Sequence, residues 1–372
     1  MKRLSRLAAC LLALTLTACT TAETAVPAAT APPTAAPSPT AAPTAAPQAT
    51  PLPYDDLSYV PEFGFQQKQT YQPDEYNRLY LDTYSFNDRT VLVGAEDETA
   101  ALLEAVDARD LPGMADVDSS LLLFCREIRK TATVALSGEC ADEIFGGYPW
   151  YRDKTVRERY GFPWAQSTAY RVSFFKPEVF GSIDPAAYID EGYRATLEQT
   201  SIRPGLDPLE QRMRQMFALN FNWFMQTLLD RKDRMSMYSG LEVRVPFCDY
   251  RIAEYLYSVP WEYKDYEGHE KGLLRQAMQG VLPTEVLWRK KSPYPKTWNP
   301  AYLNAVSAML RSAMQDPDAP LLRIAKRAAL EQLLTAAETA TPWYGQLMTT
   351  PQTIAWFVQL NYWLQKYRVE LV

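Results

Sequence analysis

Residues 133–152 read TVALSGECADEIFGGYPWYR, and this stretch decides the expected fold. A short apolar run at residues 134–136 ends at Ser137-Gly138, which is the pattern of a strand followed by a turn. A helix is expected to begin after this turn and to end at the glycine pair Gly146-Gly147. In open α/β sheets, ligands bind at the carboxyl ends of strands, where such a turn lies. The stretch therefore predicts an α/β fold with a binding site at this turn.

Two acidic residues, Asp142 and Glu143, follow the turn closely. Free backbone N–H groups at a helix N-terminus suit a phosphate. Neighbouring carboxylates suit Mg²⁺, which usually shares its oxygen ligands with nucleotide phosphates. The same short pattern also describes a buried strand with a capped helix after it and no ligand. For the motif taken alone, that structural interpretation is preferred.

The longer string resembles the S-G-E-G-A-D-E-x-F-G-G-Y signature in the synthetase domain of glutamine-dependent asparagine synthetases, with Cys140 where the commonest form has glycine. Other motifs of that family occur in the same order, and together they cover about residues 100–372, with a looser resemblance over residues 60–100. These motifs are DLPGMADVDSS at 110–120, LDRKDRMSM at 229–237, LEVRVPFCD at 241–249, GHEKGLLR at 268–275 and RKK at 289–291.

The resemblance implies a fold and a reaction. The fold is an incomplete parallel-sheet core of the nucleotide α-hydrolase (ATP pyrophosphatase-like) type, followed by a mainly helical C-terminal half. The reaction is ATP-dependent amidation of aspartate through β-aspartyl-AMP, from which ammonia derived from glutamine displaces AMP. ATP and Mg²⁺ are therefore the expected cofactors, and aspartate with glutamine or ammonia the expected substrates.

The resemblance also assigns roles to particular residues. Asp142 would contact the metal and the pyrophosphate. Lys291 would be catalytic at the α-phosphate, with Lys290 as the alternative one residue away; alone, this basic run would be interpreted as solvated. Glu139 would be the second catalytic residue, because a carboxylate beside a desolvated site can have its pKa tuned by burial. The other residues expected to bind the nucleotide are Ser137, Gly138 and Glu143.

Two parts expected of this family are not found in the sequence. The pyrophosphatase loop S-G-G-x-D-S would wrap the ATP phosphates, yet the only Gly-Gly pair is Gly146-Gly147. Asp118-Ser119-Ser120 lacks preceding glycines, so we predict a helix there. The glutaminase domain, with a cysteine after the initiator methionine, is also not found, since position 2 is Lys2.

Losing one hydrogen-bond donor that stabilises the transition state, such as a donor of the phosphate loop, typically lowers the rate ~10²–10³-fold. We therefore predict that this chain alone is impaired or inactive as a synthetase and binds ATP·Mg²⁺ weakly or not at all. A separate chain that supplies the missing half is an open alternative.

The first 19 residues predict a lipoprotein-type signal peptide. A basic beginning precedes an apolar segment from Leu7 to Leu16 that is too short to span a bilayer. Leu16-Thr-Ala-Cys19 resembles a bacterial lipobox, in which Cys19 would be lipidated and anchor the chain to the membrane. An ordinary secretory signal and a short buried helix are the alternatives.

Residues 20–53 are almost only alanine, proline and threonine, and no charge occurs between Glu23 and Asp55. Such a segment cannot bury enough apolar area to fold, and proline-rich linkers extend by ~3 Å per residue. We predict a disordered linker at 20–53, followed by an asparagine-synthetase-like domain at 54–372 that is truncated at its N-terminus.

Composition argues against several kinds of partner and site. The net charge of −6 argues against a nucleic-acid partner, which favours a basic face. With a single histidine, His-based metal sites and Ser-His triads are disfavoured. Beyond the leader, Cys125, Cys140 and Cys248 remain, and this odd number predicts no disulfide framework. Apolar periodicity predicts helices over 208–237, 300–314, 321–337 and 353–367.

Three functional hypotheses remain open. The chain is an asparagine-synthase-like enzyme with impaired activity, a membrane-anchored non-catalytic binding lipoprotein, or a chimeric or misassembled gene product. The leader predicts an extracytoplasmic, membrane-anchored location. The family resemblance predicts a cytoplasmic one, which applies if the leader is a gene-fusion artefact.

Overall fold

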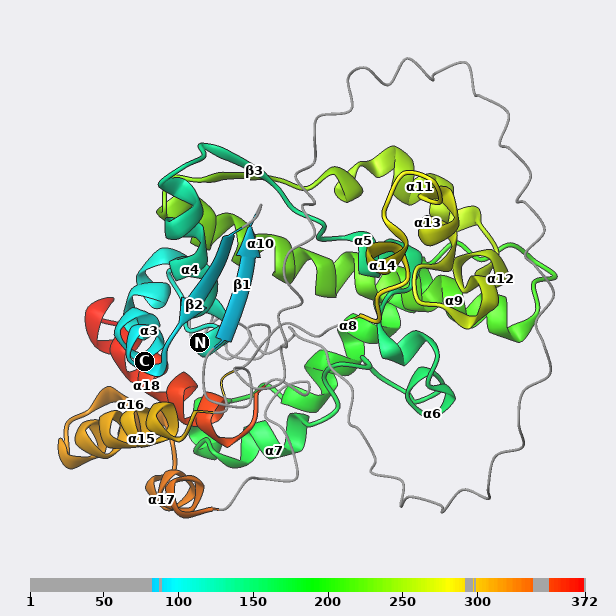
Figure 1. The fold of residues 1–372 in the computed structure, drawn as a ribbon. Coiled ribbons are helices and arrows are strands. Elements are labelled where there is room, and N and C mark those ends of the chain that lie inside the picture. Colours follow the sequence, from blue (N-terminus) through cyan, green and yellow to red (C-terminus); the bar gives the residue numbers. More distant parts are fainter. Residues whose placement is uncertain (1–81, 87–88, 292–296, 298, 337–347, 371–372) are drawn as a thin grey trace, which may run out of the picture.

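The computed structural model describes residues 82–86, 89–291, 297, 299–336 and 348–370, and these residues are mostly helical (Figure 1). In the first half the elements are β1 (Asp82–Phe86), β2 (Arg89–Val93), α3 (Ala95–Arg109), α4 (Asp116–Arg129), β3 (Val134–Leu136), α5 (Ala141–Phe145), η2 (Pro149–Tyr151), α6 (Lys154–Arg157), α7 (Thr168–Ser173), η3 (Pro177–Val179) and α8 (Pro185–Gln199). In the second half they are α9 (Pro208–Leu219), η4 (Asn220–Phe224), α10 (Met225–Tyr238), β4 (Glu242–Arg244), η5 (Pro246–Cys248), α11 (Tyr250–Ser258), α12 (Trp261–Lys264), η6 (Tyr266–Gly268), α13 (Gly272–Ala277), α14 (Thr284–Leu287), α15 (Pro300–Gln315), α16 (Pro320–Ile324), α17 (Arg327–Thr335) and α18 (Thr350–Lys366).

The strand predicted at residues 134–136 is confirmed as β3, which pairs in parallel with β4. The pairing continues past the strands, because the backbone N–H of Ser137 donates to the carbonyl of Arg244 at 2.8 Å. Parallel pairing brings the carboxyl ends of both strands to one edge, so the turn after β3 and the loop after β4 are neighbours. Among the described residues, the parallel sheet is limited to these two short strands, and β1 and β2 form a separate antiparallel pair.

Three of the four predicted long helices are confirmed, and one is wrong. Helices α9 and α10, joined by the π-helical turn η4, account for residues 208–237, and α15 and α18 also lie where expected. Residues 321–337 do not form one helix, because α16 ends before an antiparallel bridge between Phe175 and Ala325. Lys326 N–H donates to the Phe174 carbonyl at 2.8 Å in this bridge, so strand-like pairing replaces helical hydrogen bonds.

The largest core surrounds α18, which packs against α3, α15 and α16 on one side of the molecule (Figure 1). Trp356 and Phe357 are almost completely buried in it. The buried Gln359 joins α18 to the segment before α4 and to α3, since its Oε1 accepts from Gly113 N–H at 3.2 Å and its Nε2 donates to the Leu102 carbonyl of α3 at 3.0 Å. The helix predicted at Asp118-Ser119-Ser120 is confirmed as part of α4, whose first turns are buried.

The prediction of no disulfide framework among Cys125, Cys140 and Cys248 is wrong, because two of them are bonded. Cys140, just after β3, is bonded to Cys248, just after β4, and the two Cα atoms lie 5.6 Å apart. An odd count of cysteines does not exclude one pair, and the parallel sheet brings together two residues that are 108 positions apart. Cys125 is a free, buried thiol, and burial raises its pKa to about 11.

The predicted signal peptide at 1–19, with Cys19, and the predicted linker at 20–53 lie outside the described residues. Within the described part of the chain, the helices are all too short or too polar to cross a lipid bilayer.

Candidate functional site

The glycine pair of the signature shapes the candidate site. Gly146 ends α5 in the left-handed conformation, with φ at 70°. A Cβ on Gly147 would lie 1.8 Å from Asp142 Oδ1, so only glycine lets the chain return this close to the carboxylate. The predicted helix start and stop are therefore confirmed, but α5 is only five residues long. Such a short helix carries a weak macrodipole, so positive charge at the site has to come from side chains.

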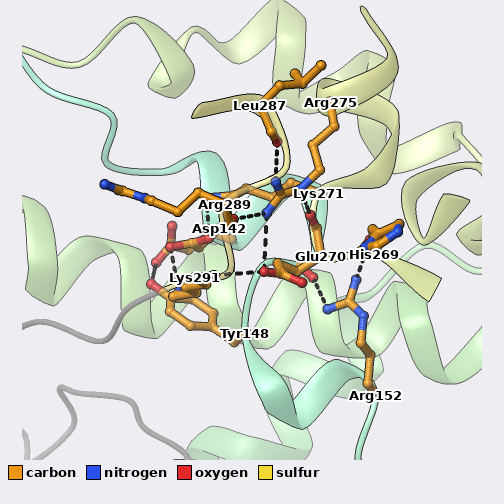
Figure 2. Close-up of polar contacts among 12 residues, drawn as sticks. Asp142, Tyr148, Arg152, His269, Glu270, Lys271, Arg275, Leu287, Arg289 and Lys291 are labelled. Carbon is orange, nitrogen blue, oxygen red and sulfur yellow. Dashed lines mark hydrogen bonds and ion pairs between the residues drawn. The ribbon is translucent and has the colours of Figure 1, made fainter. Parts of the chain in front are cut away.

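Two lysines from distant motifs supply that charge (Figure 2). Lys291 Nζ lies 2.7 Å from Asp142 Oδ2, and Lys271 Nζ lies 2.9 Å from Asp142 Oδ1. Burial alone would raise the pKa of Asp142, but the charges and hydrogen bonds of Lys291 and Lys271 outweigh it and hold the pKa below its usual value. Asp142 is therefore an ionised carboxylate between two cations.

The structure distinguishes Lys291 from its neighbour Lys290. Lys291 reaches Asp142 with its Nζ 4.1 Å from the centre of the Tyr148 ring, a cation–π geometry. Its backbone N–H donates to Glu270 Oε1 at 2.9 Å. Lys290 is exposed. Of the two lysines that the sequence left open, Lys291 is the one that the structure brings to the site.

Glu143 is the most buried carboxyl of the site, with 2% of its surface exposed. Its Oε1 accepts a hydrogen bond from the Tyr148 hydroxyl, and its backbone carbonyl accepts one from the Tyr151 hydroxyl at 3.0 Å. Burial raises the pKa of Glu143 to about 7, and the charge of Asp142 adds to the rise, while the Tyr148 hydrogen bond opposes it. Glu143 can therefore gain or lose a proton near neutral pH.

Arg275 organises the loop that carries Lys291. Its guanidinium donates to the backbone carbonyls of Leu287 and Arg289, the latter at 3.1 Å. It also pairs with Glu270 Oε1 at 3.1 Å, and the same oxygen accepts the Lys291 N–H (Figure 2). Removing Arg275 would release the backbone just before Lys291, so we interpret it as a positioning residue.

Glu139 is held by a different part of the molecule. Its Oε1 lies 3.5 Å from Lys232 Nζ and 4.0 Å from Arg231 Nη2, both on α10. Its second oxygen, Oε2, is buried and has no hydrogen-bond partner among the described residues. The remaining turn residues are accessible: Gly138 is exposed, and the half-buried Ser137 accepts from the Glu139 N–H at 3.4 Å. The turn thus presents Glu139 beside α10, while Asp142 and Glu143 face the lysines.

Four residues of the site were not singled out from the sequence as site residues: Tyr148, Glu270, Lys271 and Arg275. All four lie in motifs that the sequence analysis had already quoted, within GGY and GHEKGLLR. The motifs were therefore a usable signal, but the pairing of Lys271 with Asp142 depends on contact across more than a hundred positions.

A metal at Asp142 would need ligands from outside these residues. Within the described ranges, no group of three histidine, cysteine, aspartate or glutamate side chains could hold a metal ion. Mg²⁺ typically binds through one or two carboxylates together with substrate phosphates. The residues present therefore fit a Mg²⁺ shared with phosphate oxygens better than a metal held by protein alone.

Comparison with known proteins agrees with these motifs. The sequence profile described as asparagine synthase matches residues 60–365. The chain is similar to asparagine synthetase [glutamine-hydrolyzing] 3 of Bacillus subtilis, with 42% identity over 326 residues, covering 86% of this chain and 53% of that protein. It is 26% identical over 239 residues to asparagine synthetase [glutamine-hydrolyzing] 1 of the same organism, covering 53% of this chain and 36% of that protein.

A shorter match, 45% over 67 residues, links the chain to the asparagine synthetase [glutamine-hydrolyzing] of Gallus gallus, covering 17% of this chain and 12% of that protein. The chain belongs to the asparagine synthase family. It spans about half the length of the first of these relatives and about a third of the second. The match to the asparagine synthase profile also includes residues 60–100, where the motifs gave only a looser resemblance.

Proposed function

We propose that this chain carries the synthetase chemistry of its family, the ATP-dependent amidation of aspartate through β-aspartyl-AMP, and that the chain alone performs it poorly or not at all. The family implies a nucleotide α-hydrolase type of core, of which β3, β4 and the turn after β3 would be one part. The observation that carries the proposal is the Asp142 carboxylate held between Lys271 and Lys291 at the carboxyl edge of the parallel sheet.

The two lysines would stabilise negative charge on phosphate oxygens. Cations stabilise negative charge that develops on phosphate oxygens most strongly when they are already in position before it develops. Asp142 and Tyr148 hold Lys291 in place, and Glu270 and Arg275 hold the backbone that carries it. Mg²⁺, when bound, would neutralise the pyrophosphate, and Asp142 is the residue that would hold it.

Two carboxyl groups of the site have separate proposed roles in proton handling. Glu139, predicted from the sequence, lies on the turn and would accept a proton from the attacking ammonia. Glu143 has a pKa of about 7 because of burial, so it can exchange a proton near neutral pH. We assign the amidation step to Glu139 and propose that Glu143, beside Asp142, adjusts the charge of the phosphate site.

The absence of an S-G-G-x-D-S motif from the sequence supports the proposal of low activity, because each lost donor is expected to cost ~10²–10³ in rate. A separate chain supplying the missing half would restore those donors.

The leader supports a second candidate, a membrane-anchored non-catalytic binding lipoprotein lipidated at Cys19. A chimeric gene product is the third. Incorporation of a labelled fatty acid into the full chain, and its loss in Cys19→Ser, would support the anchored location; no incorporation would contradict it.

The test of the proposed activity is pyrophosphate release by the full chain with ATP, Mg²⁺, aspartate and ammonia. Ammonia replaces the product of a glutaminase. We expect release at least ~10²-fold slower than that of the Bacillus subtilis relative with 42% identity. Lys291→Gln should abolish it, whereas the exposed neighbour Lys290→Gln should leave it unchanged.

Release that Lys291→Gln leaves intact would contradict the assigned site. Release as fast as that of the relative would contradict the proposed impairment. No release from folded protein, either alone or together with a chain that supplies the missing half, would favour the non-catalytic lipoprotein.

A further inference from the structure

Cys140 has a backbone conformation that glycine adopts freely and that residues with a side chain adopt only with strain. It precedes α5 with φ at 75°, in the left-handed region. The family signature commonly has glycine at this position, so the cysteine replaces the residue best suited to the turn. Its side chain is buried, with 1% exposed. A compensating interaction of the sulfur would explain a cysteine here.

The sulfur of Cys140 makes such an interaction with Cys248. The Cα separation of 5.6 Å is within the range for a disulfide. Cys248 ends η5, just after β4, and its Sγ lies 3.9 Å from Met225 Sδ on α10. The bond therefore links the turn that carries Glu139 and Asp142 to the loop after the neighbouring strand.

We propose that the Cys140–Cys248 bond is a redox latch of the site turn. Formed under oxidising conditions, it holds residues 137–143 against the loop after β4, and its reduction releases them. This inference rests on the geometry of the two strand ends and is independent of the proposed synthetase activity.

The chemistry of closing the latch is a thiol–disulfide exchange. The Cys248 thiolate attacks an external disulfide, and one external thiol leaves with the electron pair of the broken S–S bond. The Cys140 thiolate then attacks the mixed disulfide on Cys248, forming the internal bond and releasing the second external thiol. The two protein thiols lose two protons and two electrons, and the external disulfide becomes two thiols. Cys248 is the entry point, because it is half-buried and Cys140 is fully buried.

The third cysteine of the described domain does not compete for the bond. Cys125 is buried with 2% exposed, and burial raises its pKa to about 11. Since the thiolate is the reacting form, Cys125 is inert at neutral pH. It therefore provides a matched control.

The Cys140–Cys248 bond is also relevant to whether the chain is exported or remains in the cytoplasm. Stable disulfides are formed and retained mainly outside the reducing cytoplasm. An oxidised Cys140–Cys248 pair agrees with export through the predicted leader, which is a separate observation from a separate part of the sequence. In the cytoplasm the same pair would be reduced and the turn released.

The test compares the full chain equilibrated with glutathione disulfide and with dithiothreitol. Peptide mapping without reduction should find a peptide containing Cys140 linked to one containing Cys248, and this assignment is not confused by Cys10 or Cys19. Dithiothreitol should lower the melting temperature by roughly 5–15 °C, because the bond closes a loop of more than a hundred residues. Amide hydrogen exchange over residues 137–143 should become faster on reduction.

Three variants sharpen this test. Cys125→Ser should respond to dithiothreitol as the unmodified chain does, whereas Cys140→Gly and Cys248→Ser should not respond. Cys140→Gly should melt above Cys248→Ser, because glycine relieves the left-handed strain and a lone Cys140 does not. Two free thiols at Cys140 and Cys248 after equilibration with glutathione disulfide would overturn the proposal. Unchanged hydrogen exchange of the turn on reduction would also overturn it.

Discussion

The core around α18 and the site around Asp142 are built on opposite principles. The core is apolar and closed: Trp356 and Phe357 are almost completely buried, and a polar residue such as Gln359 has both ends of its amide paired. The site is charged and partly open, and it depends on short elements and left-handed residues such as Cys140 and Lys271. The side chains of the core are closed off from solvent, whereas the charged side chains of the site lie where a ligand can reach them.

This difference indicates where stability and function reside. Apolar burial in the α18 core contributes most of the stabilisation. The site retains a buried carboxyl, Glu143, and an exposed turn, Gly138, which do not favour stability. Mutations in the two regions should therefore differ in size, and in the site they should also depend on pH.

The largest effect is expected in the core. Trp356→Ala should lower the free energy of unfolding by about 3–5 kcal/mol, because it leaves a cavity where the side chain is 1% exposed. Tyr255→Ala on α11, 69% exposed, should change it by less than about 0.5 kcal/mol. Denaturant unfolding at neutral pH measures both variants. Similar losses for the two would show that α18 is not the centre of the stable core.

The next effect concerns the buried carboxyl of the site. The folded pKa of Glu143 is about 7, above the ordinary glutamate value of 4.5, so the stability present below pH 4.5 is lost as pH rises through 7. Glu143→Gln should match the unmodified chain at pH 4 and be more stable than it by about 3 kcal/mol at pH 8.

Unfolding curves at the two pH values test this expectation, with the exposed Glu262→Gln as control. A stability difference between Glu143→Gln and the unmodified chain that does not change with pH would contradict the raised pKa.

A smaller effect is expected at Asp142. Asp142→Asn should cost about 1 kcal/mol at neutral pH, because the carboxylate and its two lysines are each about a quarter exposed and solvent screens them. The pKa of Asp142 is lowered, so its contribution is present above the unfolded pKa and is lost as pH falls through the folded pKa.

The stability difference between Asp142→Asn and the unmodified chain should therefore shrink as pH falls below about 4. Thermal melts between pH 3 and pH 7 would show this, with the exposed Asp318→Asn as the comparison. A difference that grows at low pH would mean that Lys271 and Lys291 do not stabilise the carboxylate.

Much of the local structure could be predicted from the sequence. The strand at 134–136, the turn after it and the glycine stop were confirmed, as were the helices over 208–237, 300–314 and 353–367. Each depends on periodicity or on residues within a few positions of one another. The prediction of one helix over 321–337 was wrong, because an antiparallel bridge between Ala325 and Phe175, about 150 positions earlier, interrupts it.

The sequence by itself determined the family, most of the elements and part of the site, because the motifs SGE, DE and RKK contain Glu139, Asp142, Glu143 and Lys291. Tertiary structure alone decided which of these groups meet. It selected Lys291 over Lys290, added Lys271 to Asp142, raised the pKa of Glu143 by burial and joined Cys140 to Cys248. The reason is that charge pairing, desolvation and disulfide formation depend on distance in space, which short-range sequence patterns do not encode.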